Sequence, residues 1–168
     1  MMEARKAGIF MFREMNRKKQ QLSQEECVDI LKTEPRGVLS LLGDGGYPYG
    51  VPMDHWYNDA DGCLYFHSGK RGHKIDAMER CAKASFCVMD SGFRREGEWA
   101  LNIRSVIVFG RLQVVADREE AIEITRQLSY KYTSDAEFIE REIRESCANV
   151  LVFRLIPEHI TGKLVNES

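Results

Sequence analysis

Short apolar segments separated by strong turn signals are the feature that most limits how this chain can fold. An apolar run at 37–42 is followed by Asp44-Gly45-Gly46, and the apolar pattern resumes at 49–57. A second polar, glycine-containing break at 58–62 precedes another short segment at 63–67. Connections this short join antiparallel strands, because a parallel connection needs a dozen or more residues. The pattern therefore predicts an antiparallel β-sheet.

The rest of the chain continues the β pattern and adds helices beside it. Further strands are expected at 84–89, at 101–115 with a bulge or bend at Gly110, and at 150–156, where Pro157 breaks the strand before an extended tail at 159–165. Helices are expected at 23–31, where Ser23 and Glu26 form a capping box, at 73–81, after Asp117, and at 135–145. Six strands with flanking helices indicate a mainly β fold, an antiparallel barrel with helical additions. No G-x-G-x-x-G motif supports a Rossmann fold.

Length and charge narrow the class of protein. The 168 residues, 43% of them hydrophobic, are enough for one domain with a core, which we place at 20–168 after an N-terminal arm at 1–19. A net charge of −2 leaves no surplus of basic residues for nucleic acid. No apolar run has the length of a membrane span or a signal peptide, so no membrane association is expected.

The cysteines indicate a reducing compartment. They form an odd, scattered set without C-x-x-C spacing: Cys27, Cys63, Cys81, Cys87 and Cys147. Such a set fits reduced thiols in a cytoplasmic protein better than a disulfide framework. A zinc site would have to combine cysteines with His67 and His73, whose spacings lack the short paired motif, so no metal is expected.

The segment 64–74 (Leu-Tyr-Phe-His-Ser-Gly-Lys-Arg-Gly-His-Lys) carries the main candidate binding site. It is expected to leave a strand, pass through a turn with two glycines, and enter a helix near Ile75. Exposed backbone N–H groups at a helix start, together with Ser68 and Lys74, favour an anion such as a phosphate. The alternative is an ordinary first turn of a helix with a solvated lysine.

Three motifs in order resemble the flavin-binding split-barrel proteins. They are Tyr49-Gly50-Val51-Pro52-Met53, the segment from Phe66-His67-Ser68 to Gly72-His73-Lys74, and Arg104-Ser105-Val106-Ile107-Val108-Phe109-Gly110. Within that superfamily the chain is similar to the nitroimidazole-resistance (Nim-type) branch of the pyridoxamine 5'-phosphate oxidase-like group, from about residue 11 to 163. The resemblance implies a six-stranded antiparallel split β-barrel that forms a homodimer, with two FMN sites at the subunit interface.

The resemblance also implies roles for individual residues. One strand would line the edge of the flavin ring, His67 and Ser68 would lie beside the ribityl phosphate, and the start of the following helix would hold the phosphate. A further strand would approach the flavin from the partner subunit. By position, the implied FMN-binding residues are Val51, Pro52, Met53, Asp54, His67, Ser68, Gly72, His73, Lys74, Ser105, Val106 and Ile107.

The function implied is that of an FMN-dependent oxidoreductase that passes electrons to a small acceptor such as a nitroimidazole or another nitroaromatic compound. A nicotinamide nucleotide is one electron donor that would serve, and no protein nucleophile is expected. Trp99 either covers the flavin ring or packs on the core. Oxidation of vitamin B6 is disfavoured, because the strand at 51–53 lacks the arginine that true pyridoxamine-phosphate oxidases carry. The alternative is a non-catalytic flavin-binding or haem-binding module.

Overall fold

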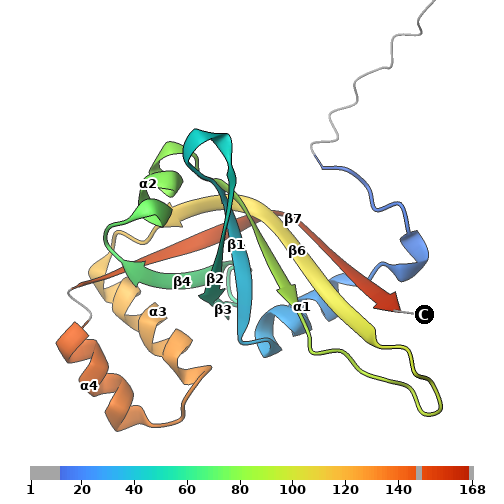
Figure 1. Ribbon diagram of the computed structural model, residues 1–168. Helices are drawn as coiled ribbons and strands as arrows, with labels where there is room; N and C mark the ends of the chain where they lie inside the picture. Colours follow the sequence, from blue (N-terminus) through green and yellow to red (C-terminus); the bar gives the residue numbers. More distant parts are fainter. Residues whose placement is uncertain (1–11, 147–148, 167–168) are drawn as a thin grey trace, which may run out of the picture.

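One curled antiparallel sheet makes up the body of the molecule, for which the computed structural model describes residues 12–146 and 149–166 (Figure 1). Its seven strands lie in the order β2-β1-β5-β6-β7-β4-β3. They are β1 (Arg36–Leu42), β2 (Pro48–Asp54), β3 (Trp56–Tyr57), β4 (Leu64–Gly69), β5 (Lys83–Met89), β6 (Asn102–Val114) and β7 (Val150–Asn166). The helices are α1 (Gln24–Thr33), α2 (His73–Arg80), α3 (Arg118–Tyr130) and α4 (Ala136–Ser146), with short 3-10 turns at Lys18–Gln20 and Asp44–Gly46.

The predicted split barrel is confirmed, with seven strands in the described residues instead of the expected six. The strand predicted at 49–57 divides at His55 into β2 and β3, which lie at opposite edges of the sheet. Because a single residue joins these two edge strands, the sheet must curl until its edges approach each other. Curling brings β2 and β4, the strands of the predicted site, to the same side of the molecule.

The prediction that Pro157 breaks the last strand is wrong. β7 is one strand of 17 residues that passes through Pro157. The pairing with β6 shifts so that Phe109 lies opposite His159 and Gly110 lies opposite Pro157, which leaves Glu158 as the extra residue of a bulge. Proline has no backbone N–H to donate to the neighbouring strand, and the irregular pairing at the bulge tolerates this missing donor. The irregularity expected at Gly110 is confirmed, and a Cβ at this glycine would lie 2.2 Å from the carbonyl oxygen of Ile156.

The main core lies on the inner face of the curled sheet. Along β1 and β5, buried residues alternate with more exposed ones, as expected for strands with one face covered. α1 covers this face and packs against β3, β5, β6 and β7. Its predicted capping box is present, because Ser23 and Glu26 bond to each other's backbone N–H groups. Fully buried members of this core include Ile30, Leu31, Leu39, Phe66, Phe86, Val108 and Phe153.

The described part of the N-terminal segment follows β7. The N–H of Leu22 donates to the carbonyl of Gly162 at 3.0 Å, and Phe12 stacks on His159 with 4.8 Å between ring centres. A Cβ at Gly162 would lie 2.5 Å from the sulfur of Cys27, so this glycine allows α1 to approach β7 closely. Residues 1–11 of the predicted arm lie outside the described residues.

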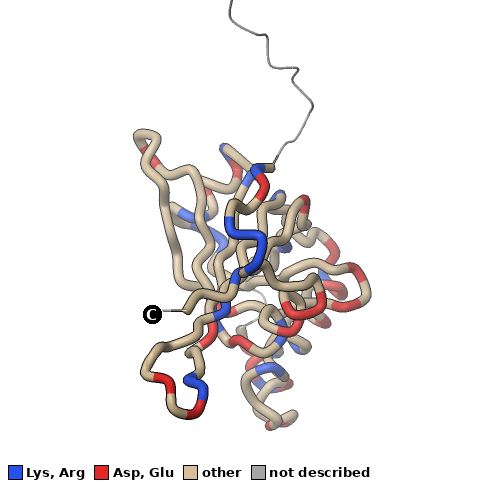
Figure 2. Tube along the Cα trace, turned by 90° about the vertical axis from the view of Figure 1, so that its right-hand side faces the viewer, with Lys and Arg blue, Asp and Glu red and all other residues tan. Residues whose placement is uncertain are grey.

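The surface carries mixed charge. Figure 2, turned by 90° from the view of Figure 1, shows basic and acidic residues interspersed along the chain. In the N-terminal segment, Lys18 pairs with Glu14 at 2.9 Å, and both side chains are exposed. The described cysteines are all free, with Cys27 and Cys63 buried, while Cys147 lies outside the described residues. Within 12–146 and 149–166, no helix combines the length and apolar character needed to cross a membrane.

A buried polar network holds the junction between β2 and β3. His55 is fully buried, and its Nε2 lies 2.8 Å from the carbonyl oxygen of Leu31 near the end of α1, so Nε2 carries the proton. Lys131, at the end of α3, donates to the carbonyl of Glu34 at 2.7 Å. The Tyr132 hydroxyl accepts from the N–H of His55 at 3.1 Å. The junction is therefore tied to two helices that are distant from it in sequence.

Burial shifts the pKa values of both His55 and Lys131 in this network. It lowers the pKa of His55 to about 3, and the charge of Lys131 acts in the same direction. It also lowers the pKa of Lys131 to about 8. Among the described residues, the Nδ1 atom of His55 has no hydrogen-bond partner. The folded protein therefore keeps a neutral imidazole at the junction.

We expect the free energy of unfolding to fall as the pH drops from 6.5 toward 3. In this window the unfolded chain binds a proton at His55 that the folded chain excludes, and the expected loss is about 2 kcal/mol by a pH of about 5. Above pH 8 the folded chain releases the proton of Lys131 first, so stability rises toward pH 10.5. Urea unfolding at a series of pH values measures both effects.

The control for this prediction is a second histidine. His55→Gln should flatten the acid dependence, whereas His159→Gln, at a partly exposed position on β7, should keep the dependence of the unchanged protein. Equal acid slopes in all three proteins would contradict the assignment to His55.

Candidate functional site

A pocket of about 450 Å³ lies where β2, β4 and α2 meet the start of β1. Its volume is in the range of small-molecule sites. The lining residues are Arg36, Pro52, Met53, Asp54, His67 and Lys74. Five of these six were expected from the sequence, and the curling of the sheet brings them together from three separate segments.

Arg36 is the member that the sequence reasoning missed. Its Nε lies 2.6 Å from the Oδ1 of Asp54, directly opposite it on β2. The two residues face each other because β1 and β2 pair around the turn at Asp44–Gly46, and counting outward from that turn would have found the pair. Arg36 holds the Asp54 carboxylate at the pocket, and this carboxylate in turn raises the pKa of Arg36.

Lys74 is the cation of the pocket that has no counter-ion. Among the described residues it makes no hydrogen bond or ion pair, and burial lowers the pKa of its amine. His67 lies on β4, two residues before the end of the strand, and is exposed at the surface. Partial enclosure nevertheless lowers the pKa of its ring; Asp54 acts against this shift and Lys74 adds to it. A cation that is partly buried without a partner favours an anionic ligand.

The start of α2 lies next to the pocket and is open. Gly72 is its N-cap residue, with a φ of 120° that favours glycine, and no side chain caps the helix. Its first N–H groups are therefore not covered by a capping side chain, as an anion site at a helix start requires.

His73 follows Gly72 but does not line the pocket. Its ring stacks on Tyr49 with 4.1 Å between ring centres, and its Nε2 lies 3.6 Å from a carboxylate oxygen of Asp44. Arg80 approaches the same carboxylate at 2.7 Å. In this chain His73 joins α2 to the turn between β1 and β2, an arrangement that no local sequence pattern indicates.

The remaining predicted residues lie outside this pocket. Val51 is partly buried against the core, and Ser68 pairs with Leu151 on β7. Ser105, Val106 and Ile107 lie on β6, which β1 and β5 separate from β2. The side chain of Val106 is buried in the core, whereas Ile107 is 39% exposed on the outer face. Residues 105–107 therefore do not line the pocket of their own chain.

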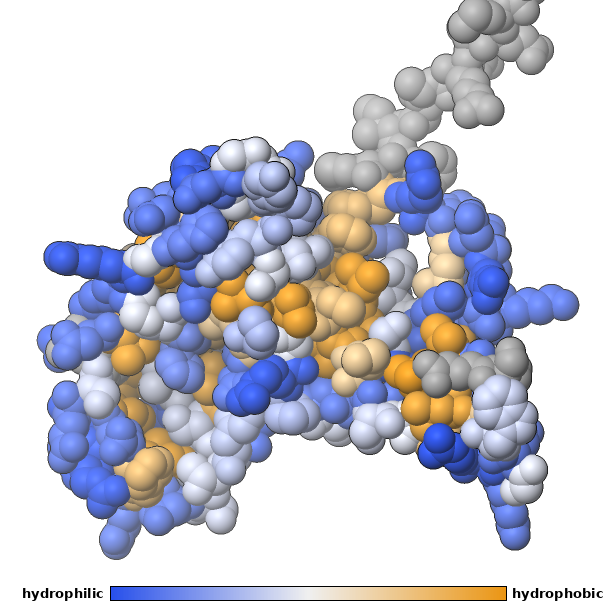
Figure 3. All heavy atoms as spheres, viewed as in Figure 1, coloured by the Kyte–Doolittle hydropathy of each residue, from blue (hydrophilic) through white to orange (hydrophobic). Residues whose placement is uncertain are grey.

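The outer face of the sheet carries an apolar row that begins at the pocket. Pro52 pairs with Val38, Val38 with Cys87, and Cys87 with Ile107, so one continuous row crosses β2, β1, β5 and β6. Val38 and Ile107 are exposed, as are the nearby Met89 and Phe109. Figure 3 shows apolar side chains gathered over the middle of this face. A surface of this kind is typical of a protein–protein contact.

Two other sequence candidates do not join the site. Trp99 lies in the loop between β5 and β6 and is 76% exposed, so its side chain is not packed on the core. It does not line the pocket either. Within the described ranges, no three His, Cys, Asp or Glu side chains gather closely enough to hold a metal ion. The chemistry that the pocket offers is therefore binding of an anion through Lys74 and the start of α2, beside an apolar strand edge.

Comparisons with known proteins identify the family. The sequence matches the model of the pyridoxamine 5'-phosphate oxidase family over residues 23–164. No curated protein matches significantly. The fold is similar to that of a candidate 5-nitroimidazole antibiotic resistance protein from Bacteroides thetaiotaomicron, with a TM-score of 0.73, 21% identity and 87% of each chain covered.

Two further solved structures are similar. One is an FAD-binding protein from Mesorhizobium loti, with a TM-score of 0.62, 26% identity, and coverage of 87% of this chain and 97% of that one. The other is an FAD- and heme-binding protein from Mycobacterium smegmatis, with a TM-score of 0.63, 23% identity, and coverage of 86% and 73%. Because the family model matches most of the sequence, this chain belongs to the pyridoxamine 5'-phosphate oxidase family.

Proposed function

We propose that this protein binds FMN in the pocket between β2, β4 and α2, with the phosphate at Lys74 and the start of α2. The observation that carries the proposal is the partly buried amine of Lys74, which has no counter-ion among the described residues and lies beside an uncapped helix start. A phosphate would supply the missing negative charge and accept N–H bonds from the helix. Two similar structures are described as binding FAD, so the experiment below also identifies which flavin this chain binds.

The residues around Lys74 fit a flavin in kind. Pro52 and Met53 offer an apolar strand edge for a planar ring, while Asp54, held by Arg36, and His67 offer polar groups at the same pocket. The space beside Gly72 is open, because a Cβ built on this residue would meet no atom within 4 Å. With no side chain at Gly72, a ligand can approach the backbone there closely.

We further propose that the protein is a homodimer through the apolar row Pro52-Val38-Cys87-Ile107. Because this row begins at a pocket residue and ends on β6, a two-fold contact over it can bring the partner's Ile107 toward the pocket of the first chain. This supports the expected role of Ser105 and Ile107 as contacts from the partner subunit, whereas the side chain of Val106 faces the core of its own chain. The pocket would then be completed only in the dimer.

The activity we propose is the reduction of small acceptors such as nitroimidazoles and other nitroaromatic compounds. A bound flavin supplies the electron-transfer chemistry. The chain holds the cofactor phosphate through Lys74, positions Asp54 through Arg36, and places the His67 ring where it can donate a hydrogen bond at the pocket. The alternative, a flavin- or haem-binding module without turnover, is kept because one similar structure is described as binding both FAD and heme.

The purified protein should show the visible absorption of oxidised flavin and release FMN on denaturation. Lys74→Ala should weaken FMN retention by about tenfold or more, because a charge-assisted contact to the phosphate is lost, with the fold unchanged. Chromatography of the released cofactor and titration of the cofactor-free protein measure this. Lys83→Ala, at an exposed lysine on β5, is the matched control. Unchanged retention in Lys74→Ala would rule out the phosphate assignment, and a Soret band would favour haem.

Replacing Ile107 by Asp should convert the dimer into a monomer, because it places a charge in the centre of the apolar row. Sedimentation equilibrium measures the mass. Phe138→Asp, at an exposed aromatic residue on α4, is the control and should remain a dimer. A monomeric unchanged protein, or a dimeric Ile107→Asp variant, would contradict the proposed interface.

Flavin-loaded protein should oxidise NADH or NADPH in the presence of a nitroimidazole such as metronidazole, and the nitro absorbance should be lost as the nicotinamide is consumed, in a ratio set by the number of two-electron steps that the nitro group accepts. The Lys74→Ala variant should lose this activity in proportion to its lost flavin. Flavin that stays oxidised under either donor, while remaining bound, would instead identify a non-catalytic binding module.

A further inference from the structure

The pocket between β2, β4 and α2 has two ends that lie at different positions along β2. Its apolar lining, Pro52 and Met53, belongs to the last part of this strand. The start of α2 lies nearer the beginning of the strand, because the ring of His73 stacks on Tyr49. Strands advance about 3.3 Å per residue, so about 10 Å of β2 separates the two ends. A flavin that lies on this strand with its phosphate at Lys74 would therefore point the phosphate toward the turn between β1 and β2.

That end of the pocket is closed by contacts between α2 and the turn, which lie side by side in Figure 1. The rings of His73 and Tyr49 stack with 4.1 Å between their centres and 18° between their planes. The backbone of the turn lies directly against this pair, because a Cβ at Gly43 would be 2.9 Å from the Cβ of Tyr49 and 3.6 Å from the His73 ring. Arg80 of α2 binds the Asp44 carboxylate that His73 also faces. The stacked pair and the turn behind it therefore form a wall beyond the phosphate position.

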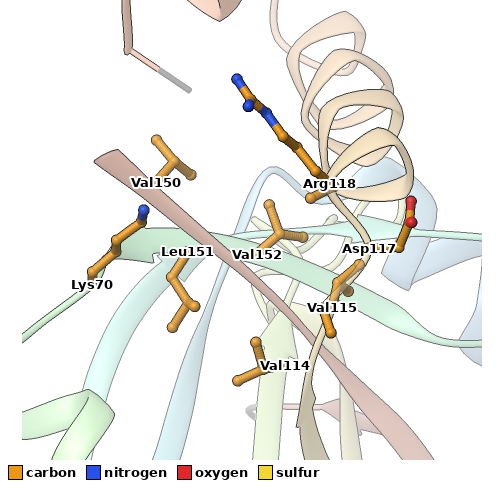
Figure 4. Close-up of a pocket in the computed structure, with 10 residues that line it drawn as sticks. Lys70, Val114, Val115, Asp117, Arg118, Val150, Leu151 and Val152 are labelled. Atoms are coloured by element: carbon orange, nitrogen blue, oxygen red, sulfur yellow. The ribbon is translucent and has the colours of Figure 1, made fainter. Parts of the chain in front are cut away.

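The neighbouring hollow does not extend the pocket. It has a volume of about 420 Å³ and lies between the end of β6, the start of α3 and the start of β7, where Figure 4 shows Lys70 beside Val150 and Leu151. It shares no lining residue with the flavin pocket, although Lys70 and Lys74 belong to the same segment of the chain. Among the described residues, neither the wall nor this hollow continues the pocket past the phosphate position.

We propose that the stacked pair His73–Tyr49 makes this pocket selective for FMN over FAD. This inference rests on the proposed binding of flavin with its phosphate at Lys74. FAD carries an additional adenylate group on the phosphate of FMN, and that group would be directed at the wall. FMN ends in its phosphate, which needs no space beyond the helix start and can accept the N–H groups there. The selectivity comes from a steric barrier against the longer ligand, not from an added contact to the shorter one.

The test is calorimetric titration of the cofactor-free protein with FMN and with FAD, in which FMN should bind more tightly by about tenfold or more. His73→Ala removes one ring of the wall, so the ratio of the two affinities should fall by about fivefold or more. His73→Phe supplies a ring that can stack on Tyr49 and should restore the selectivity. His159→Ala is the matched control and should leave the ratio unchanged, because His159 also stacks on an aromatic ring but lies outside the pocket.

The inference is overturned if FMN and FAD bind the unchanged protein equally, or if His73→Ala and His159→Ala give the same ratio. Tyr47, on the same turn, is 77% exposed, so an adenine that passed the wall could stack on it. Tighter binding of FAD that is lost in Tyr47→Ala would therefore also overturn the selectivity. In each of these results a flavin is bound, so the proposed function stands. If neither flavin binds, the proposed function fails together with the selectivity.

Discussion

The hydrogen bonds around His55 are the constraint on which the rest of the structure depends. This single residue joins the two edge strands of the sheet, and its burial fixes where the edges meet. The bond to Leu31 ties the junction to α1, and Lys131 and Tyr132 tie it to α3. Because Asp54 precedes His55 in the chain, the same bonds set the position of the pocket. A polar group in the core is costly unless it is bonded, so the network also disfavours other ways of closing the sheet.

Much of this fold could be predicted because its signals are local. The capping box of Ser23 and Glu26, the turn at Asp44–Gly46 and the cap at Asp117 each involve residues within a few positions of one another. Five of the six pocket residues were likewise found in short motifs, through their resemblance to a family. The resemblance implied the split barrel but no strand order, and the turns specify only neighbouring strands, so the order of the seven strands came from the structure.

The rest depended on contacts between distant parts of the chain. Lys131 lies 76 residues from His55, and nothing near either residue indicates that a lysine and a histidine will share the carbonyls at the end of α1. The continuity of β7 through Pro157 was missed for the same reason, because the bulge that accommodates the proline depends on the facing strand. Arg36 is a different case, since the register that places it opposite Asp54 follows from a turn already recognised.

The segment 64–74 shows how a motif that is local in sequence is divided by the fold. The sequence predicts one phosphate-binding turn there, and the structure splits it between the strand β4, which supplies His67 to the pocket, and the first turn of α2, which supplies Lys74. Lys70 and Arg71, which lie in the turn between them, do not line this pocket. The two side chains reach one pocket because the curl of the sheet brings β2 beside both elements.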